Sequence, residues 1–326
     1  MFRSNKVKKS NDALNGLERV KALIEGVDSV VIGAGAGLST AAGYRYSGEP
    51  FARYFTDFAG LYDFQDMYSG GFYPYDTLEE YWGYWSRYIW VNRYLDCPGD
   101  VYRNLLKLVE KKNYFVLTTN VDHCFHKAGF DKKRLFYTQG DYGLWQAGSG
   151  QPKKTYDNYH QVKQMILSQG WRIDADNDLL APSLDGGYTK HTSAIDWSQL
   201  KLAIPSELVP YGEDGLPFAM NLRADDRFVE DAGWHDAAKR YNQFIEKHAA
   251  GPIIYLEIGV GFNTPIIIKY NFWKKVHANP QAYYICLNKA EVHIPKEIRD
   301  RSIGIAGDAD VVINELVGIP KRRFLV

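Results

Sequence analysis

The chain has 326 residues, 45% of them hydrophobic, and its 39 basic side chains balance its 39 acidic ones. This length suits one large domain with a smaller second one, and formal neutrality argues against a partner with a phosphate backbone. No apolar run approaches the roughly 20 residues that span a bilayer, so we expect a cytoplasmic protein with neither a nucleic-acid nor a membrane partner.

The N-terminal segment is polar and contains several lysines, and no apolar core of the signal-peptide kind follows it. We therefore expect a mobile tail over residues 1–15. The three cysteines, Cys97, Cys124 and Cys286, lie far apart in the sequence and offer neither a disulfide framework nor a Cys-x-x-Cys zinc site. Three reduced thiols and no metal site are the expectation.

The first predicted strand leads into a glycine-rich turn. Residues 29–43, SVVIGAGAGLSTAAG, pass from a β-branched run through alternating glycines to an alanine-rich helix start, a pattern typical of dinucleotide sites. The strict G-x-G-x-x-G fingerprint fails in both frames, because Leu38 or Thr40 holds its last position, which disfavours hydride transfer. The alternative is a turn whose glycines serve tight packing alone.

Two regions lack this strand-and-helix pattern. Residues 44–95 are dense in Tyr, Trp and Phe near helical spacing, which indicates an aromatic-rich helical insertion with a buried face; a stacking platform for bases is the alternative. Residues 140–235 are rich in Gly, Pro, Asp and Lys and predict a small lobe without zinc ligands, held by packing. Its candidate core residues are Trp145, Ile166, Leu167, Trp171, Trp197 and Leu200.

Four further apolar segments end in polar or glycine-rich clusters, namely residues 114–117, 253–258, 282–288 and 302–307. They predict an α/β fold with a Rossmann-like doubly wound parallel sheet and a second, smaller domain built from two insertions. In such sheets ligands bind at the carboxyl ends of the strands, so the clusters should converge on one crevice. The sheet domain is expected to comprise residues 16–43, 96–139 and 236–326.

Residues 118–129, TTNVDHCFHKAG, resemble the sirtuin signature T-x-N-x-D followed by x-x-x-H-x-x-A-G. They follow a GAG-x-S loop at residues 35–39, and LEIGVGFNTP, the LN ending at Asn288 and GDAD at residues 307–310 extend the resemblance over nearly the whole chain. Within the family the chain is most similar to the macrodomain-linked sirtuins, class M. That similarity is carried by QGDYGLWQ at 139–146, MNLR at 220–223 and VEDAGWH at 229–235.

The resemblance implies NAD as cofactor. It places Gly35, Ala36, Gly37 and Ser39 at the phosphates, and Gly259, Asn288 and Asp310 or its neighbours around the adenosine half. It further implies cofactor contacts for Gly43, Gly261 and Asn263, the last two replacing the Thr-Ser of ordinary sirtuins.

The departures from ordinary sirtuins carry the functional inference. Gln139 stands before Gly140 where deacylases have a catalytic histidine, and a carboxamide orients groups but does not titrate. Deacylation should therefore be lost, whereas departure of nicotinamide asks mainly for positioning and electrostatic support. The peptide-clamping strand is replaced by charged residues at 225–231. The zinc cysteines of class M are replaced at Ala147 with Gly150 or Gln151, and at Tyr211 with Asp214.

The resemblance assigns four catalytic residues. Asn120 would hold the ribose and a water, Asp122 would orient that water or the nicotinamide pocket, and Gln139 would bind the ribose hydroxyls. Arg223 would steer an acceptor carboxylate or a cofactor phosphate. The alternatives are that Asn120 and Asp122 cap the following helix and that Arg223 forms a solvated ion pair. His126 is expected to make a buried hydrogen bond.

The predicted function is a sirtuin-type NAD-dependent protein ADP-ribosyltransferase, which cleaves the nicotinamide–ribose bond and passes ADP-ribose to a protein. The resemblance implies a lipoyl-carrier-type acceptor and a macrodomain hydrolase as partners. Two alternatives stay open, an NAD-dependent protein deacylase and an NAD hydrolase or nucleotide sensor. Labelled NAD would distinguish them by where the label appears.

Overall fold

The computed structural model describes residues 16–319, so the tail expected at residues 1–15 lies outside the described residues. The chain divides into two compact units. The first unit comprises Met1–Gly43, Cys97–Gln139 and Ala232–Val326, and the second unit comprises Tyr44–Asp96 and Gly140–Asp231.

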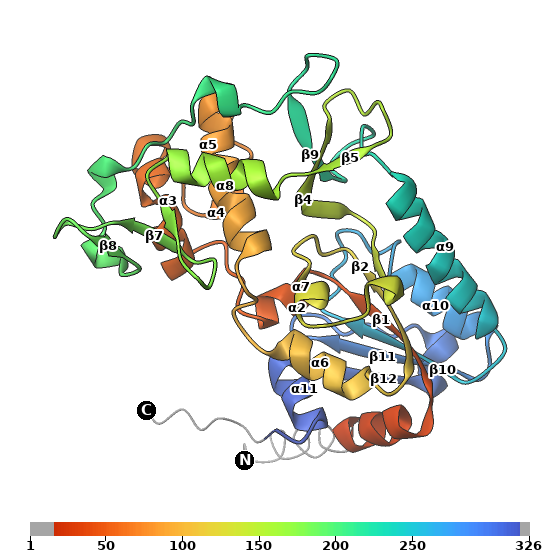
Figure 1. Ribbon diagram of the computed structural model, residues 1–326. Helices are drawn as coiled ribbons and strands as arrows, with labels where there is room; N and C mark the ends of the chain where they lie inside the picture. The colour runs from red at the N-terminus through yellow and green to blue at the C-terminus, as the bar shows by residue number, and fades with distance from the viewer. Residues whose placement is uncertain (1–15, 320–326) are drawn as a thin grey trace, which may run out of the picture. The chain divides into compact units, whose positions relative to one another are not determined.

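A six-stranded parallel sheet forms the centre of the first unit (Figure 1). Its spatial order is β12-β11-β10-β1-β2-β3. The strands are β1 (Ser29–Ala34), β2 (Asn113–Thr118), β3 (Leu135–Tyr137), β10 (Ile253–Ile258), β11 (Ala282–Asn288) and β12 (Ser302–Ala306). The central strands β1 and β10 are buried along their whole length, as expected for apolar runs covered on both faces. The expected α/β Rossmann-like architecture is confirmed.

Helices cover both faces of this sheet. One helix includes residues 16–26, and the others are α2 (Ala36–Ala41), α6 (Val101–Val109), α7 (Cys124–Lys127), α9 (Ala232–Lys247), α10 (Lys269–Ala278) and α11 (Ala309–Leu316). The 3-10 turns η2 (Lys132–Arg134) and η6 (Lys296–Arg301) complete the unit. Helices α9 and α10 bury one sheet face, where Phe115 and Phe136 pack against Tyr241. Helices α6 and α11 pack together on the other face (Figure 1).

The order of the strands places a topological switch between β1 and β10. Along the chain the sheet grows from β1 to β2 in one direction and from β10 to β11 in the other, while β1 and β10 pair in register from Val30 with Ile254 to Ala34 with Ile258. The loops after these two strands must therefore diverge to opposite faces. Ligands of open α/β sheets bind in the crevice that this divergence leaves.

The second unit combines helices with two small antiparallel sheets. Its helices are α3 (Glu49–Tyr62), α4 (Met67–Gly71), α5 (Leu78–Ile89), the π-helical turn η1 (Trp90–Tyr94) and α8 (Tyr159–Ser168), with 3-10 turns η3 (Thr192–Ala194), η4 (Trp197–Gln199) and η5 (Ser206–Leu208). One sheet has the order β5-β4-β9 (Thr155–Asp157, Gly140–Ala147, Phe218–Leu222). The other has the order β6-β7-β8 (Arg172–Ile173, Leu179–Pro182, Tyr188–Thr189).

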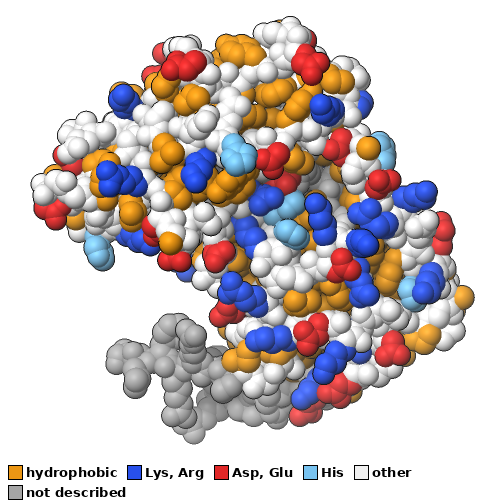
Figure 2. Space-filling model, viewed as in Figure 1, with side chains coloured by type: hydrophobic (Ala, Val, Ile, Leu, Met, Phe, Trp, Pro, Cys, Tyr) orange, Lys and Arg blue, Asp and Glu red, His pale blue; other side chains and the backbone are white. Residues whose placement is uncertain are grey.

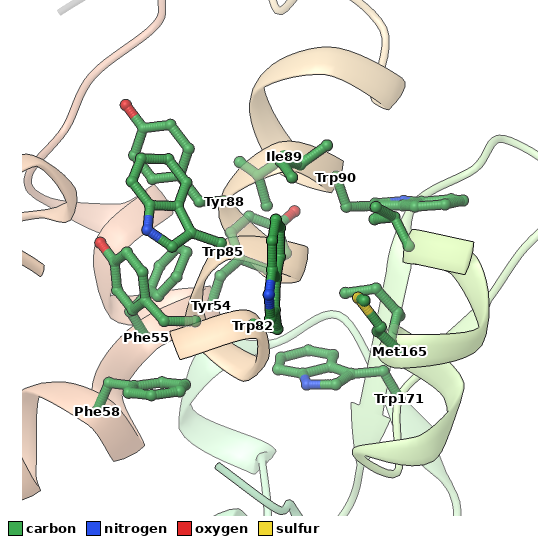
Figure 3. Close-up of a cluster of buried hydrophobic side chains, with 14 of the residues drawn as sticks. Tyr54, Phe55, Phe58, Trp82, Trp85, Tyr88, Ile89, Trp90, Met165 and Trp171 are labelled. Carbon is green, nitrogen blue, oxygen red and sulfur yellow. The ribbon is translucent and has the colours of Figure 1, made fainter. Parts of the chain in front are cut away.

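An aromatic core holds the second unit together (Figure 3). Trp82 and Trp90 are fully buried on α5 and η1, and Trp171 and Met165 reach the same core from the second insertion. The interpretation of the aromatic-rich region as a packed core is thus confirmed. Of the residues expected to form the core of the small lobe, Trp145, Ile166, Trp171 and Leu200 are buried and Trp197 packs against them; Leu167 is exposed.

The two turns at the replaced zinc positions are connected through the β4–β9 ladder. The amide of Gly150 donates to Ala147 O in one turn, and Gly212 donates to Leu216 O in the other. Ala147 pairs with Phe218 in the β4–β9 ladder, which brings the turns together. Phe218 also stacks on Tyr156 with ring centroids 4.8 Å apart. Backbone pairing and aromatic packing therefore stabilise this region.

Acidic and basic side chains are intermingled on the face drawn in Figure 2, as their equal numbers lead one to expect. None of the helices in the described part of the chain combines the length and apolar character that a membrane span requires. Within residues 16–319, no three His, Cys, Asp or Glu side chains form a group that could hold a metal ion.

Candidate active site

Two glycine loops interlock at the topological switch. Gly35 N donates to Ile258 O at 3.1 Å, and Gly37 N donates to Gly259 O at 2.9 Å. A Cβ on Gly37 would lie 2.6 Å from Gly259 Cα, and one on Gly259, whose φ is +62°, would lie 2.5 Å from Leu38 N. Tight packing therefore accounts for these glycines by itself. The hydrogen bond to Gly259 O also uses the Gly37 N–H, which the sequence predicts as a donor to a pyrophosphate.

A pocket of about 150 Å³ opens beside this junction at the carboxyl ends of the strands. Its lining comes from α2, from Gly259 and from the loops that follow β11 and β12. The residues are Gly37, Thr40, Ala41, Gly259, Leu287, Asn288, Lys289, Ala290, Gly307, Asp308 and Ala309. Of the predicted cofactor residues, Gly37, Gly259 and Asn288 line it, whereas Gly261, Asn263 and Asp310 do not.

The loop after β11 is held in shape by Asn288. Its Nδ2 donates to Val260 O at 3.0 Å, and its Oδ1 accepts from Ala290 N at 3.0 Å. Lys289, next along the chain, forms an exposed ion pair with Asp308 at 3.1 Å. Asp308, and not Asp310, caps α11 by accepting the Asp310 amide. Asp308, a neighbour of Asp310, therefore lines the pocket in place of Asp310, and Lys289 is a charged pocket residue that was not predicted.

A chain of hydrogen bonds connects Asn120 to Asp122 through two other elements. Asn120 Nδ2 donates to Gly35 O at 3.0 Å and to the Tyr102 hydroxyl at 3.2 Å. Tyr102 OH lies 3.0 Å from Ser39 Oγ, which donates to Asp122 Oδ2 at 2.5 Å. Three predicted residues, Ser39, Asn120 and Asp122, therefore meet around one that was not predicted.

The donors in this series of hydrogen bonds fix the direction in which each bond is donated. Asn120 donates to the Tyr102 hydroxyl, and the Ser39 hydroxyl donates to Asp122. The Tyr102 hydroxyl therefore donates its own proton to Ser39 Oγ. Burial raises the pKa of Tyr102 well above its ordinary value, which keeps the hydroxyl protonated. Asp122 Oδ1 also accepts from Cys124 N at 2.9 Å, the capping contact that was considered as the alternative. Asn120 Oδ1 accepts no hydrogen bond from the described residues, which leaves it available to a ligand.

Gln139 follows the edge strand β3. Thr138 before it is anchored twice to the carbonyl of Thr118, by its amide at 2.9 Å and its hydroxyl at 3.0 Å. The Gln139 side chain is half-buried and makes no hydrogen bond with any described residue. A carboxamide on an anchored backbone, with its own polar atoms unused, is suited to bind hydroxyl groups of a ligand.

Two histidines follow Asp122. His123 has a left-handed backbone with φ 57° and stacks on Tyr137 with ring centroids 3.9 Å apart. The expectation of a buried hydrogen bond at His126 was wrong, because that side chain is exposed and its backbone amide donates to Tyr137 OH. The reason is that α7 is a single short turn, which buries Cys124 and Phe125 and turns His126 outward.

The remaining predicted residues lie elsewhere. Arg223 belongs to the second unit, where its guanidinium pairs with Glu230 at 2.5 Å and lies 4.3 Å from the Phe228 ring centroid. That geometry agrees with the ion-pair alternative. Gly43 ends the α2 segment with φ +101°, and Ala36 is exposed in the first turn of α2.

Comparisons with known proteins agree with this architecture, although no protein-family model matches the chain. A Staphylococcus aureus relative named protein ADP-ribosyltransferase is 35% identical over 299 residues, which cover 91% of this chain and 85% of the relative. A Fusarium oxysporum f. sp. cubense relative, named probable bifunctional ADP-ribose hydrolase/ADP-ribosyltransferase, is 26% identical over 269 residues, 80% of this chain and 40% of the relative.

Solved structures show the same fold. A structure of Sir2 with a p53 peptide and NAD+ is 15% identical with a TM-score of 0.52, covering 92% of this chain and 96% of that one. A structure of Sir2 bound to an acetylated peptide is 14% identical with a TM-score of 0.52, covering 93% and 99% of the two chains.

Proposed function

This chain belongs to the sirtuin family, and from that premise we propose that it transfers ADP-ribose from NAD to a protein acceptor. The support is the similarity over nine-tenths of the chain to a protein ADP-ribosyltransferase, together with the dinucleotide-type crevice at the β1–β10 switch. The pocket beside Gly37, Gly259 and Asn288 would take the adenosine half of NAD.

The observation that carries the proposal is the carboxamide at Gln139. This position is the one at which sirtuin deacylases have a histidine, and no proton can be accepted there near neutral pH. Its half-buried, unpaired amide can still hold the ribose hydroxyls. The sugar can therefore be released from nicotinamide, but its hydroxyl is not activated to attack an acyl group.

The Asn120–Tyr102–Ser39–Asp122 chain would position the reaction. NAD supplies the ribose carbon from which nicotinamide leaves with the bonding electrons, and the acceptor nucleophile forms the new bond to that carbon. Asn120, fixed by Gly35 and Tyr102, would offer Oδ1 to a ribose hydroxyl or to a water. Asp122, which accepts hydrogen bonds from Ser39 Oγ and Cys124 N, holds Ser39 and the start of α7 in place.

The acceptor and partners are the finer part of the proposal. A lipoyl-carrier-type acceptor and a macrodomain hydrolase follow from the resemblance to class M sirtuins. The Fusarium relative is named as both a probable ADP-ribose hydrolase and an ADP-ribosyltransferase, which supports a pairing of ADP-ribose transfer with the removal of ADP-ribose. Arg223 is the proposed contact to an acceptor carboxylate or a cofactor phosphate, for which it would exchange Glu230. The proposed location is the cytoplasm.

One observation favours deacylation as a second candidate. The His123 imidazole stacks with ring centroids 3.9 Å apart on Tyr137, which lies two residues before Gln139. If it replaced the missing histidine, the variant His123→Ala would lose acyl release from an acylated peptide. We expect no acyl release from either the wild-type protein or this variant.

The proposal is tested by incubating the purified protein with a cell lysate and NAD labelled in its adenine ring. Label on a protein band, dependent on active enzyme, is the expected result. The variant Asn120→Ala should leave the band unlabelled while retaining the fold, as judged by its circular dichroism. If the label were recovered only as free ADP-ribose, the reaction would be hydrolysis of NAD and not transfer to a protein.

A further inference from the structure

Two cysteines that are distant in the sequence meet in the first unit. Cys97 Sγ lies 2.8 Å from Cys124 Sγ, a separation about 0.8 Å longer than a disulfide bond. Both are free thiols, and Cys286, the third cysteine, is buried against Glu257 instead. Cys97 and Cys124 are 27 positions apart in the sequence, and the fold brings them together because the start of α7 lies against the segment before α6.

From this contact we infer that Cys97 and Cys124 form a site of reversible oxidation, at which a peroxide converts the two thiols to an intramolecular disulfide. The inference does not depend on the proposed function. It rests on the sulfur–sulfur distance, on the unequal exposure of the two thiols and on the backbone contacts that hold them together.

The two thiols differ in their access to an oxidant. Cys97 is partly exposed, whereas Cys124 is fully buried. Burial, the hydrogen bond with Cys97 and the nearby Asp122 charge raise the pKa of Cys124 well above its ordinary value. Cys97 is therefore the thiol that meets peroxide first, and Cys124 is the thiol that resolves the product.

The reaction balances with peroxide as the oxidant. The Cys97 thiolate sulfur attacks one peroxide oxygen, the O–O bond breaks, and the hydroxide that leaves becomes water. Cys124 sulfur then attacks the resulting sulfenic acid, the S–S bond forms, the S–O bond breaks, and the Cys124 proton leaves with the hydroxide as a second water. Two thiols are oxidised and one hydrogen peroxide is reduced to two waters.

Backbone contacts fix the geometry of this pair. A Cβ on Gly99 would lie 2.9 Å from Ala42 O, so the segment after Cys97 runs directly against the end of α2. Cys124 N is tied to Asp122 Oδ1 at 2.9 Å. Because both sulfurs sit on held backbones, the effective concentration of one thiol at the other is high. The disulfide would fasten the start of α6, which carries Tyr102, to the loop that carries Asp122.

The experiment uses the full-length protein, reduced, desalted and treated with a small excess of hydrogen peroxide. Free thiols are then alkylated and the protein is digested without reductant for mass spectrometry. We expect one cross-linked peptide pair joining Cys97 and Cys124, two hydrogens lighter than the reduced pair, while Cys286 is found alkylated. The matched control Cys286→Ser should give the same cross-link, and Cys97→Ser should give none.

Thermal unfolding gives an independent readout. The disulfide closes a loop of 26 intervening residues, from 98 to 123, so reducing it should lower the melting temperature of oxidised wild-type protein by about 5 °C. Reductant should leave the Cys97→Ser variant unchanged. Sulfenic or sulfinic acid on Cys97 with no cross-link would overturn the inference, as would a cross-link between two protein molecules or one through Cys286.

Discussion

The variant Tyr102→Phe tests whether the hydrogen-bond chain positions Asn120. It removes only the hydroxyl that accepts from Asn120 Nδ2 at 3.2 Å and lies 3.0 Å from Ser39 Oγ. Asn120 keeps its bond to Gly35 O, so one buried N–H loses its partner. A buried donor without a partner costs about 1–3 kcal/mol, and the free energy of unfolding in urea should fall by about that amount.

Turnover should fall as well, because the Asn120 carboxamide would then be held at one point instead of two. We expect nicotinamide release to slow by about tenfold, equivalent to about 1.4 kcal/mol of lost transition-state positioning. The assay measures nicotinamide release at saturating NAD alongside urea unfolding of the same preparation. Binding of NAD should change less than turnover, because the adenosine pocket does not include Tyr102.

Tyr114→Phe is the matched control. Tyr114 is also buried, and its hydroxyl accepts from Asp131 N at 3.0 Å in the same unit, outside the hydrogen bonds that join Asn120 and Ser39. It should lower stability while leaving the rate per folded molecule unchanged. Wild-type turnover in Tyr102→Phe, or equal slowing in both variants, would rule out a positioning role for the Tyr102 hydroxyl.

Three further outcomes are expected. Arg87→Met should lower the free energy of unfolding, measured in urea, by about 3–5 kcal/mol. The reason is that the fully buried guanidinium pairs with Asp57 at 2.8 Å, and its loss leaves that carboxylate unpaired. A decrease of less than about 1 kcal/mol would contradict this expectation. Gly259→Ala, whose Cβ would lie 2.5 Å from a backbone nitrogen of α2, should abolish NAD binding by calorimetry, whereas Gly261→Ala, whose Cβ meets nothing within 4 Å, should not. Burial raises the pKa of Tyr81 to about 12 from about 10 in the unfolded chain, so the folded state favours the neutral phenol. Its stabilising contribution should be complete below about pH 10 and lost as pH rises towards 12, and tyrosinate absorbance should rise together with unfolding; ionisation well before unfolding would count against it.

The strands of the first unit could largely be predicted, because most of them are apolar runs, buried throughout in β1 and β10 and for most of their length in β2 and β11. The expected segments 114–117 and 302–307 became β2 and β12 with small changes at their ends. The edge strand β3 was missed, since Leu135–Tyr137 is only three residues long and follows a basic turn. The strands of the second unit were not predicted either, because they are also short. Apart from β4, none of them exceeds five residues, too few to show an alternating pattern.

The residues of the site that belong to sequence motifs were predicted, and the others were not. Ser39, Asn120 and Asp122 belong to motifs and meet as expected, whereas Tyr102 stands on α6 among ordinary core residues, where no motif distinguishes it from a packed aromatic. Its one signal was a hydroxyl on a fully buried helix face, which needs a partner. Lys289 was missed because its relevance depends on the loop that Asn288 folds, and loop shape is not read from residue type.

We propose that the carboxamide at Gln139 permits transfer of ADP-ribose and not deacylation. The most direct measurement counts all products in one reaction containing adenine-labelled NAD, a lysate and an acylated peptide. We expect labelled protein to form together with nicotinamide and no acyl group to leave the peptide. Acyl release in step with nicotinamide, with the label on a small acylated ADP-ribose, would contradict it.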